Sequence, residues 1–202
     1  MIGGRKMSYS LFSIKDLEIL QQVAFFHKIY NFLFHLNFEY PQFKKWYSEL
    51  FDHNFIINKE RDIIICMIDN SIAGIAITKK TINERKICTL RVAPKYQQMG
   101  IGSSLLEHCF ESLNDDKPLI TIHISKYNSF KKLFEKYNFN LVQQIPGYYG
   151  FFRSELSYNG LLSDGINANH SIIEQFAFNF EKKIFECSFD NKRIIRPKLI
   201  VT

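Results

Sequence analysis

Cysteine is scarce in this chain, with four copies among 202 residues, and the four show none of the paired spacings of metal sites or redox motifs. Cys66 and Cys88 lie in apolar strand-like runs, and Cys109 lies on the apolar face of a helical segment. We therefore expect buried free thiols, no metal and a reducing compartment.

Long apolar segments and dense basic runs are also missing. No apolar run approaches the roughly 20 residues of a membrane span. No apolar stretch as long as that of a signal peptide follows Arg5 and Lys6. The formal charge is +6, yet no Lys/Arg run reaches the roughly five to eight residues typical of a nucleic-acid arm. We expect a cytoplasmic protein without membrane contact, and the charge pattern argues against a nucleic-acid partner.

The segments that are present predict an α/β (mixed α+β) domain over residues 1–161, in which 1–7 form a leader. The expected order is a strand at 8–14, helices over 15–36 and 41–51, strands at 62–68, 72–78 and 86–93, a helix at 101–113, a strand at 119–125, a helix ending at 137 and a β-pair at 139–144 and 151–158. This order favours a sheet with helices on its faces.

Residues 162–202 are interpreted as a C-terminal extension, with a helix at about 171–185 and then a strand. The 20 phenylalanines indicate aromatic-rich packing. An apolar surface patch formed by some of these side chains would support a homodimer.

A glycine-containing turn, Gln97-Gln-Met-Gly-Ile-Gly102, stands between a β-branched strand and an apolar-striped helix. Glycines let a backbone approach a ligand, and the first N–H groups of a helix have no internal partner. Such a turn can hold a pyrophosphate by main-chain donors alone. Other phosphate motifs fit less well, because Ser103 follows Gly102 where a P-loop has lysine and Leu105 stands where a dinucleotide fingerprint has a third small residue.

The wider context resembles a known family. Residues 88–106, CTLRVAPKYQQMGIGSSLL, resemble motif A of the GNAT superfamily of N-acetyltransferases, and 133–139, LFEKYNF, resemble the end of its motif B helix. The resemblance implies a mixed, mostly antiparallel sheet with helices on both faces and two parallel strands, 86–93 and 119–125, splayed apart at the cofactor site. It implies acetyl-CoA as co-substrate, no metal, and a small-molecule or peptide amine that attacks the thioester directly.

The resemblance also implies a set of cofactor contacts. Main-chain groups at Leu90, Arg91 and Val92 are expected to pair with the pantetheine arm, and an N–H near Val92 to hold the oxyanion. Asn128 is expected to add a contact from the motif B helix. The residues expected to wrap the phosphates are Gln97, Gln98, Met99, Gly100, Ile101, Gly102 and Ser103.

Phe134 departs from the family pattern, which often has a tyrosine there as the acid that protonates departing CoA. Tyr137 is the nearest phenol in sequence and is the candidate acid. A thiol has a pKa of about 8.5, so CoA can also leave as the thiolate. His123 is the candidate base, since it lies near the end of strand 119–125 where the acetyl group is expected; the alternative is a hydrogen-bonded histidine on a sheet face.

Tyr148 and Tyr149 fall in the loop between the last two strands, which in this family borders the acceptor. Packing or interface roles are the alternative for both. Two functions stay open: an N-acetyltransferase, and a GNAT-fold module that binds CoA or a partner without efficient catalysis. The missing tyrosine motivates the second, and the acceptor is not derivable from the residues.

Overall fold

The computed structural model describes residues 8–40, 42–51, 57–148 and 154–162. The chain divides into two units, Met1–Leu161 and Leu162–Thr202, and every helix and strand below belongs to the first. The leader predicted at 1–7, the helix at about 171–185 and the strand after it lie outside the described residues.

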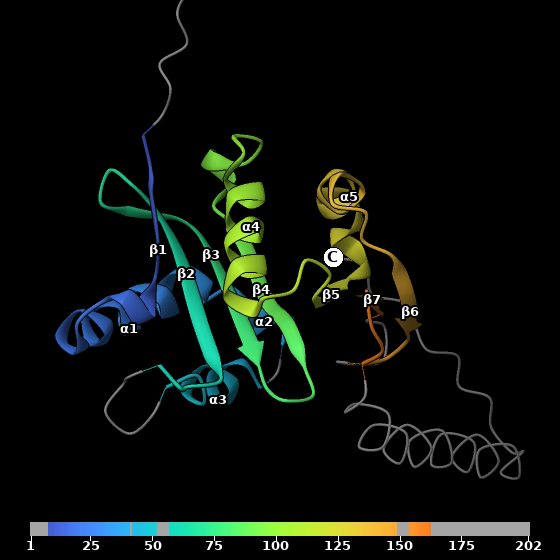
Figure 1. Ribbon diagram of the computed structural model, residues 1–202, viewed down its shortest axis with the longest axis horizontal. Coiled ribbons are helices and arrows are strands. Elements are labelled where there is room, and N and C mark those ends of the chain that lie inside the picture. Colours follow the sequence, from blue (N-terminus) through green and yellow to red (C-terminus); the bar gives the residue numbers. More distant parts are fainter. Residues whose placement is uncertain (1–7, 41, 52–56, 149–153, 163–202) are drawn as a thin grey trace, which may run out of the picture. The chain divides into compact units, whose positions relative to one another are not determined.

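One sheet of seven strands forms the centre of the unit (Figure 1). The strands are β1 (Ser10–Ser13), β2 (Arg61–Ile68), β3 (Ser71–Lys80), β4 (Arg85–Val92), β5 (Leu119–His123), β6 (Leu141–Ile145) and β7 (Glu155–Tyr158). Their order is β1-β2-β3-β4-β5-β7-β6, and every pair is antiparallel except β4–β5. The predicted mixed, mostly antiparallel sheet is confirmed.

The β2–β3 hairpin follows the sequence prediction. Asp69 and Asn70 close it with φ of 47° and 61°, the left-handed conformation that two-residue hairpin turns require. The turn sets a register in which Ile64 and Ile65 face opposite sides of the sheet, and both are buried. This hairpin therefore needs cover on both faces.

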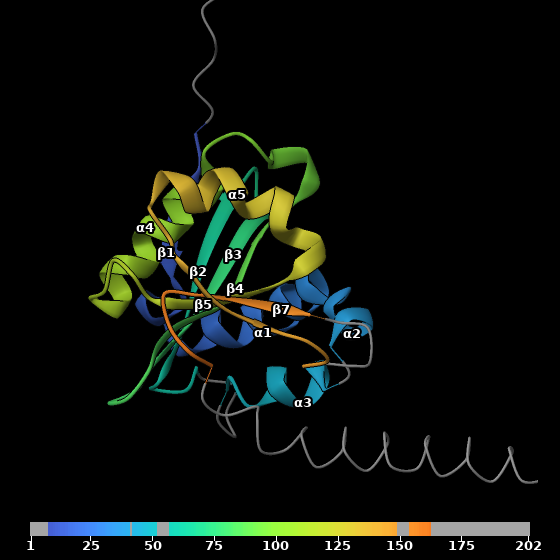
Figure 2. The ribbon, with the colours of Figure 1, turned by 90° about the vertical axis from the view of Figure 1, so that its right-hand side faces the viewer.

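Helices provide that cover on both faces of the sheet, as predicted (Figure 2). They are α1 (Ile19–Leu33), α2 (Leu36–Glu39), α3 (Phe43–Ser48), α4 (Ile101–Leu113) and α5 (Tyr127–Lys136). Buried residues of α4 and α5 pack on one face of the sheet, in a cluster that includes Ile64. Buried residues of α1 and α3 pack on the other, in a cluster that includes Ile65. Among the residues described, no helix combines the length and apolarity needed to cross a membrane.

Several element boundaries differ from the sequence prediction: the stretch predicted at 15–36 is divided into α1 and α2, and most other ends shift by one to four residues. Two of the differences have an identifiable cause. The first helix starts at Ile19 instead of 15, because the Ser13 hydroxyl caps a short 3-10 turn, Ile14–Asp16, that precedes it. The strand predicted at 119–125 ends at His123, because the Ser125 N–H donates to the His123 ring and the chain turns into the 3-10 segment Ile124–Lys126. Both ends are set by side-chain hydrogen bonds that periodicity does not report.

Helix α4 lies close against β3 at Gly74. A Cβ there would come within 2.8 Å of Leu105 Cδ1 and 3.1 Å of the Arg91 carbonyl oxygen. Leu105 Cδ1 ends a flexible side chain that can shift, but the Arg91 carbonyl oxygen belongs to the backbone, so a residue larger than glycine would strain this approach. Gly74 thus helps to set the position of the helix that follows the glycine turn at 97–102.

Candidate active site

The turn before α4 adopts a conformation that explains its first glycine. Gln98 and Gly100 have φ of 61° and 85°. A Cβ at Gly100 would meet no atom within 4 Å, so the backbone conformation, not lack of space, requires glycine. At Gly102 the nearest atom to a Cβ would be Val92 Cγ2 at 3.8 Å, which leaves ordinary room for a small side chain.

The start of α4 presents unpaired main-chain donors. Among the described residues no side chain caps it, and the first helical bond runs from the Ser104 N–H to the Gly100 carbonyl at 3.1 Å. The N–H groups of Ile101, Gly102 and Ser103 therefore have no acceptor within the helix. Because the positive end of the helix dipole lies at the same place, this turn suits an anion such as a diphosphate.

Strands β4 and β5 part beside this turn. They pair only at Lys86–Leu119 and Ile87–Ile120, although β4 continues to Val92 and β5 to His123. Figure 1 shows β4 on one side of the opening and β5 on the other. The predicted splay of two parallel strands is confirmed.

The main chain of β4 faces this opening at alternate residues. The Ala93 N–H bonds the Ala73 carbonyl beside β3 at 2.8 Å, so by alternation the main-chain groups of Leu90 and Val92 point the other way, toward β5. The Val92 carbonyl accepts a hydrogen bond from the Gln97 side-chain amide at 3.2 Å. The Leu90 groups and the Val92 N–H are thus directed into the splay.

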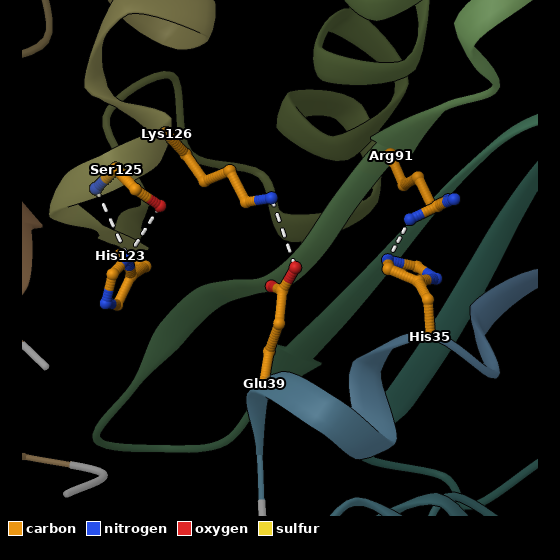
Figure 3. A network of polar contacts seen from close by, with 6 residues as sticks. All are labelled: His35, Glu39, Arg91, His123, Ser125 and Lys126. Atoms are coloured by element: carbon orange, nitrogen blue, oxygen red, sulfur yellow. Dashed lines mark hydrogen bonds and ion pairs between the residues drawn. The ribbon is translucent and has the colours of Figure 1, made fainter. Parts of the chain in front are cut away.

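A polar network lies on the α1–α3 side of the open end (Figure 3). It contains three contacts: Arg91 with His35, Lys126 Nζ with Glu39 Oε1 at 3.1 Å, and His123 Nδ1 with Ser125 Oγ at 2.7 Å. Thus His35, the residue before α2, contacts β4, and Glu39 of α2 contacts the 3-10 segment that follows β5. Nothing in the sequence predicted this meeting, since Glu39 and Lys126 are far apart along the chain.

Charges in the network are partly desolvated. Burial, and then the nearby Arg91 charge, lower the pKa of His35, which favours the neutral ring that accepts from Arg91. Burial also lowers the pKa of Arg91, whose guanidinium carbon lies 5.4 Å from the centroid of the Phe32 ring. The Arg91 side chain therefore packs against Phe32 and His35, whereas β4, the strand that carries it, borders the splay.

Glu155 is a candidate site residue that the sequence prediction did not include. It begins β7, its side chain is 1% exposed, and burial raises its pKa to about 7, with Lys86 opposing the shift and Glu39 adding to it. No motif marks it. The available signal was a lone carboxylate in a strand whose other residues are apolar or neutral.

Tyr137 is placed at the closed end of the site. Its hydroxyl donates to Glu107 Oε1 at 2.5 Å and accepts from Lys136 at 2.9 Å. Its carbonyl accepts from Lys117, which precedes β5, whereas His123 is the last residue of β5. The structure thus does not bring Tyr137 and His123 together, and the acid role of Tyr137 stays a prediction.

The remaining predicted residues lie on three different segments, apart from Tyr149. Asn128 is exposed in the first turn of α5, and Met99 is 52% exposed in the glycine turn. Tyr148 is half-buried in the turn that follows β6. Tyr149 lies outside the described residues, so the predicted acceptor role of this pair stays a prediction.

Comparison with known proteins points to one family. Residues 37–146, more than half of the chain, match the model of the acetyltransferase (GNAT) domain. A GNAT-family protein of Desulfovibrio desulfuricans is similar at 18% identity and a TM-score of 0.57, with 75% of this chain and 97% of that one covered. The ribosomal-protein-S18-alanine N-acetyltransferase of Escherichia coli is similar at 18% identity and a TM-score of 0.51, over 78% and 97%. At such identities the likeness concerns the fold alone, and no curated protein matches in sequence.

Proposed function

The chain belongs to the GNAT acetyltransferase family, and we propose that it transfers the acetyl group of acetyl-CoA to the nitrogen of an amine. One observation carries the proposal: an uncapped helix start at Gly100 lies directly beside the splay of β4 and β5. An anion-binding turn next to an open strand edge suits a ligand with a diphosphate at one end and an amide-bearing arm at the other.

The cofactor is proposed to use main-chain groups. Its diphosphate accepts hydrogen bonds from the N–H groups of Ile101, Gly102 and Ser103, while its arm pairs with Leu90 as an added strand would. The Val92 N–H then faces the thioester and holds the oxyanion that forms on attack. No metal is needed for these contacts.

The acceptor is proposed to approach from the α1–α3 side, where the polar network lies (Figure 3). The amine nitrogen attacks the thioester carbon, a C–N bond forms, and the C–S bond breaks as CoA leaves. Both substrates are bound together, so the enzyme supplies orientation and a proton acceptor for the amine. His123 at the end of β5 and Tyr148 in the nearby turn remain the sequence-based candidates for the base and for contact with the acceptor.

Thiol release from acetyl-CoA tests the proposal. The panel contains a peptide with an N-terminal alanine, because the E. coli neighbour bears that substrate in its name, an N-blocked lysine peptide and a small diamine. The expected result is amine-dependent release of CoA, with the mass of one acetyl group added to the amine. Absence of both release and acetyl-CoA binding contradicts the proposal.

One observation favours a second function, a CoA-binding module without efficient catalysis. Phe134 occupies the position where the family often has a tyrosine, and its buried ring packs 4.4 Å from the Tyr158 ring. The Tyr137 hydroxyl is engaged by Glu107. Tight CoA binding without turnover of any amine would support this alternative.

A further inference from the structure

The Glu155 carboxylate is buried and has no hydrogen-bond partner among the described residues. Its side chain is 1% exposed, and neither carboxylate oxygen accepts a hydrogen bond from any described residue. Buried carboxylates are almost always paired, and an unpaired one in a native fold calls for a specific reason.

His123 lies directly opposite Glu155 on the neighbouring strand. A main-chain bond from Ile124 to Ser154 makes the adjacent His123–Glu155 pair a non-hydrogen-bonded position, where side chains approach most closely. Cβ atoms of such pairs are about 4.5–5.5 Å apart. The two side chains also share a face, because residues alternating with them, such as Ile122 and Leu156, are buried on the α4–α5 side.

The hydrogen bonds of His123 identify its tautomer (Figure 3). The Ser125 N–H can only donate, and it does so to His123 Nδ1 at 3.2 Å. Nδ1 of the neutral ring is therefore unprotonated and the ring proton is on Nε2. Nε2 is buried and finds no acceptor among the described residues. The Nε2–H of His123 thus lacks an acceptor, and the Glu155 carboxylate on the neighbouring strand lacks a donor, among the described residues.

Charged groups on two other elements shift the pKa of Glu155. Lys86 on β4 favours the carboxylate, and Glu39 of α2, which is paired with Lys126, disfavours it. Burial is the largest influence, and together they place the pKa of Glu155 at about 7. A proton acceptor works best when its pKa lies near the operating pH.

His123 lies at the open end of the splay, and Glu155 lies opposite it on β7, on the side of β5 away from β4. β4 and β5 pair no further than Ile87 and Ile120, and His123 ends β5 beyond that point. We propose that the Glu155 carboxylate, across from the unpartnered Nε2–H of His123, accepts the proton that a cationic amine must lose before it attacks the acetyl thioester. This inference rests on the acetyltransferase function proposed above.

The proton balance follows from this role. The bound ammonium gives one proton to Glu155 and becomes the neutral amine, which forms the C–N bond. The C–S bond then breaks, and the second nitrogen proton goes to the departing thiolate. Glu155 returns its proton to solvent when the products leave. The acceptor class is therefore an amine that is an ammonium ion at neutral pH.

The test compares kcat/KM against pH for the full chain and two variants, with the panel amine that turns over fastest. The wild-type profile is expected to rise through an apparent pKa near 7. Glu155→Gln is expected to lower kcat/KM about 100-fold or more and to lose this acidic limb. His123→Gln keeps a side-chain N–H donor and is expected to retain the limb. Acetyl-CoA binding, followed by calorimetry, should stay within about threefold in both variants.

Distinct outcomes separate the possible failures. A limb that persists in Glu155→Gln and vanishes in His123→Gln makes His123 the base and overturns the proposal. Unchanged profiles in both variants also overturn it and leave the acetyltransferase function intact. A wild-type protein that acetylates no amine removes the proposed function and this inference together.

A second readout does not depend on the variant folding. The side-chain carboxyl ¹³C signal of Glu155, observed in wild-type protein labelled at glutamate, is expected to titrate with a midpoint between about 6 and 8. The signal is assigned to Glu155 because it is missing from the spectrum of the Glu155→Gln variant. If that variant does not fold, the signal is recognised by its titration midpoint. If every glutamate titrates below about pH 5, the proposal is overturned.

Discussion

At the residue scale, Glu155 is a candidate site residue that the local sequence of its strand does not reveal. Its neighbours Leu156 and Ser157 are buried like those of any central strand, and the carboxylate sits among them without a donor from the described chain. Its position opposite His123 comes from the register of β5 against β7. That register depends on tertiary pairing, so no local pattern could have reported it.

Replacing Glu155 by glutamine is expected to change how stability depends on pH. The folded-state pKa, about 7, lies above the ordinary value of 4.5. Between these values the folded state binds more protons than the unfolded one, so the contribution of Glu155 is full below 4.5 and is lost as the pH rises through 7. The loss is on the order of 3 kcal/mol.

Urea unfolding of both proteins at about pH 4 and pH 8 measures this effect. Relative to the wild type, Glu155→Gln should gain stability on going to the higher pH. If the difference in unfolding free energy between the two proteins is the same at both pH values, folding does not shift the pKa of Glu155.

At the scale of the element, the start of α4 carries the cofactor assignment. Gly102 offers a matched pair of variants, because proline in the first turn of a helix removes only an N–H that has no helical acceptor. Gly102→Ala retains that donor and places its Cβ at an ordinary 3.8 Å from Val92 Cγ2. The two variants add a Cβ at the same place and differ in the donor.

Acetyl-CoA is expected to bind Gly102→Ala within about threefold of wild type and Gly102→Pro about tenfold or more weakly, because a hydrogen bond to a charged group contributes about 1.5–3 kcal/mol. Calorimetry measures both affinities, and circular dichroism checks both folds. Equal affinities would show that this N–H does not contact the diphosphate.

The packing of α4 on β3 makes a second element-scale prediction. Gly74→Ala would bring a Cβ within 3.1 Å of the Arg91 carbonyl oxygen, a backbone atom that cannot move away freely. We expect a loss of about 1–3 kcal/mol in the free energy of unfolding. Gly160→Ala is the control, since its Cβ would lie 3.5 Å from the nearest atom, Leu119 Cδ1. If both variants unfold at the same urea concentration, the contact is less tight than described.

Elements with a strong local signal were predictable from the sequence. The β2–β3 hairpin followed from a β-branched run on each side of Asp69-Asn70, and α4 followed from its apolar stripe after Gly102. The splay followed from the family resemblance. By contrast, α2 is only four residues long, and its Glu39 reaches Lys126 across the fold. Contacts between such distant positions leave no periodic trace in a single sequence.

For the whole molecule, the proposed function implies two separate entrances to one reaction centre. The glycine turn proposed to bind phosphate precedes α4, which packs on one face of the sheet, and the polar contacts of His35 and Glu39 lie on the other. Under this proposal the thioester and the amine meet in the plane of the sheet, where β4 and β5 part. A reaction between two bound substrates follows from this geometry.

Steady-state kinetics test this arrangement. Varying acetyl-CoA at several fixed amine concentrations should give double-reciprocal lines that intersect, because both substrates occupy the enzyme before the acetyl group moves. Parallel lines, together with an acetyl group covalently held by the protein in mass spectra, would instead indicate a ping-pong reaction through an acetyl-enzyme.

Calorimetric titration of the full chain with acetyl-CoA tests the central claim most directly, because the turn at Gly100 and the splay beside it are assigned to this one ligand. The account predicts saturable binding of one acetyl-CoA per chain, with competition by CoA. Absence of heat up to millimolar acetyl-CoA, from protein shown to be folded, would contradict it.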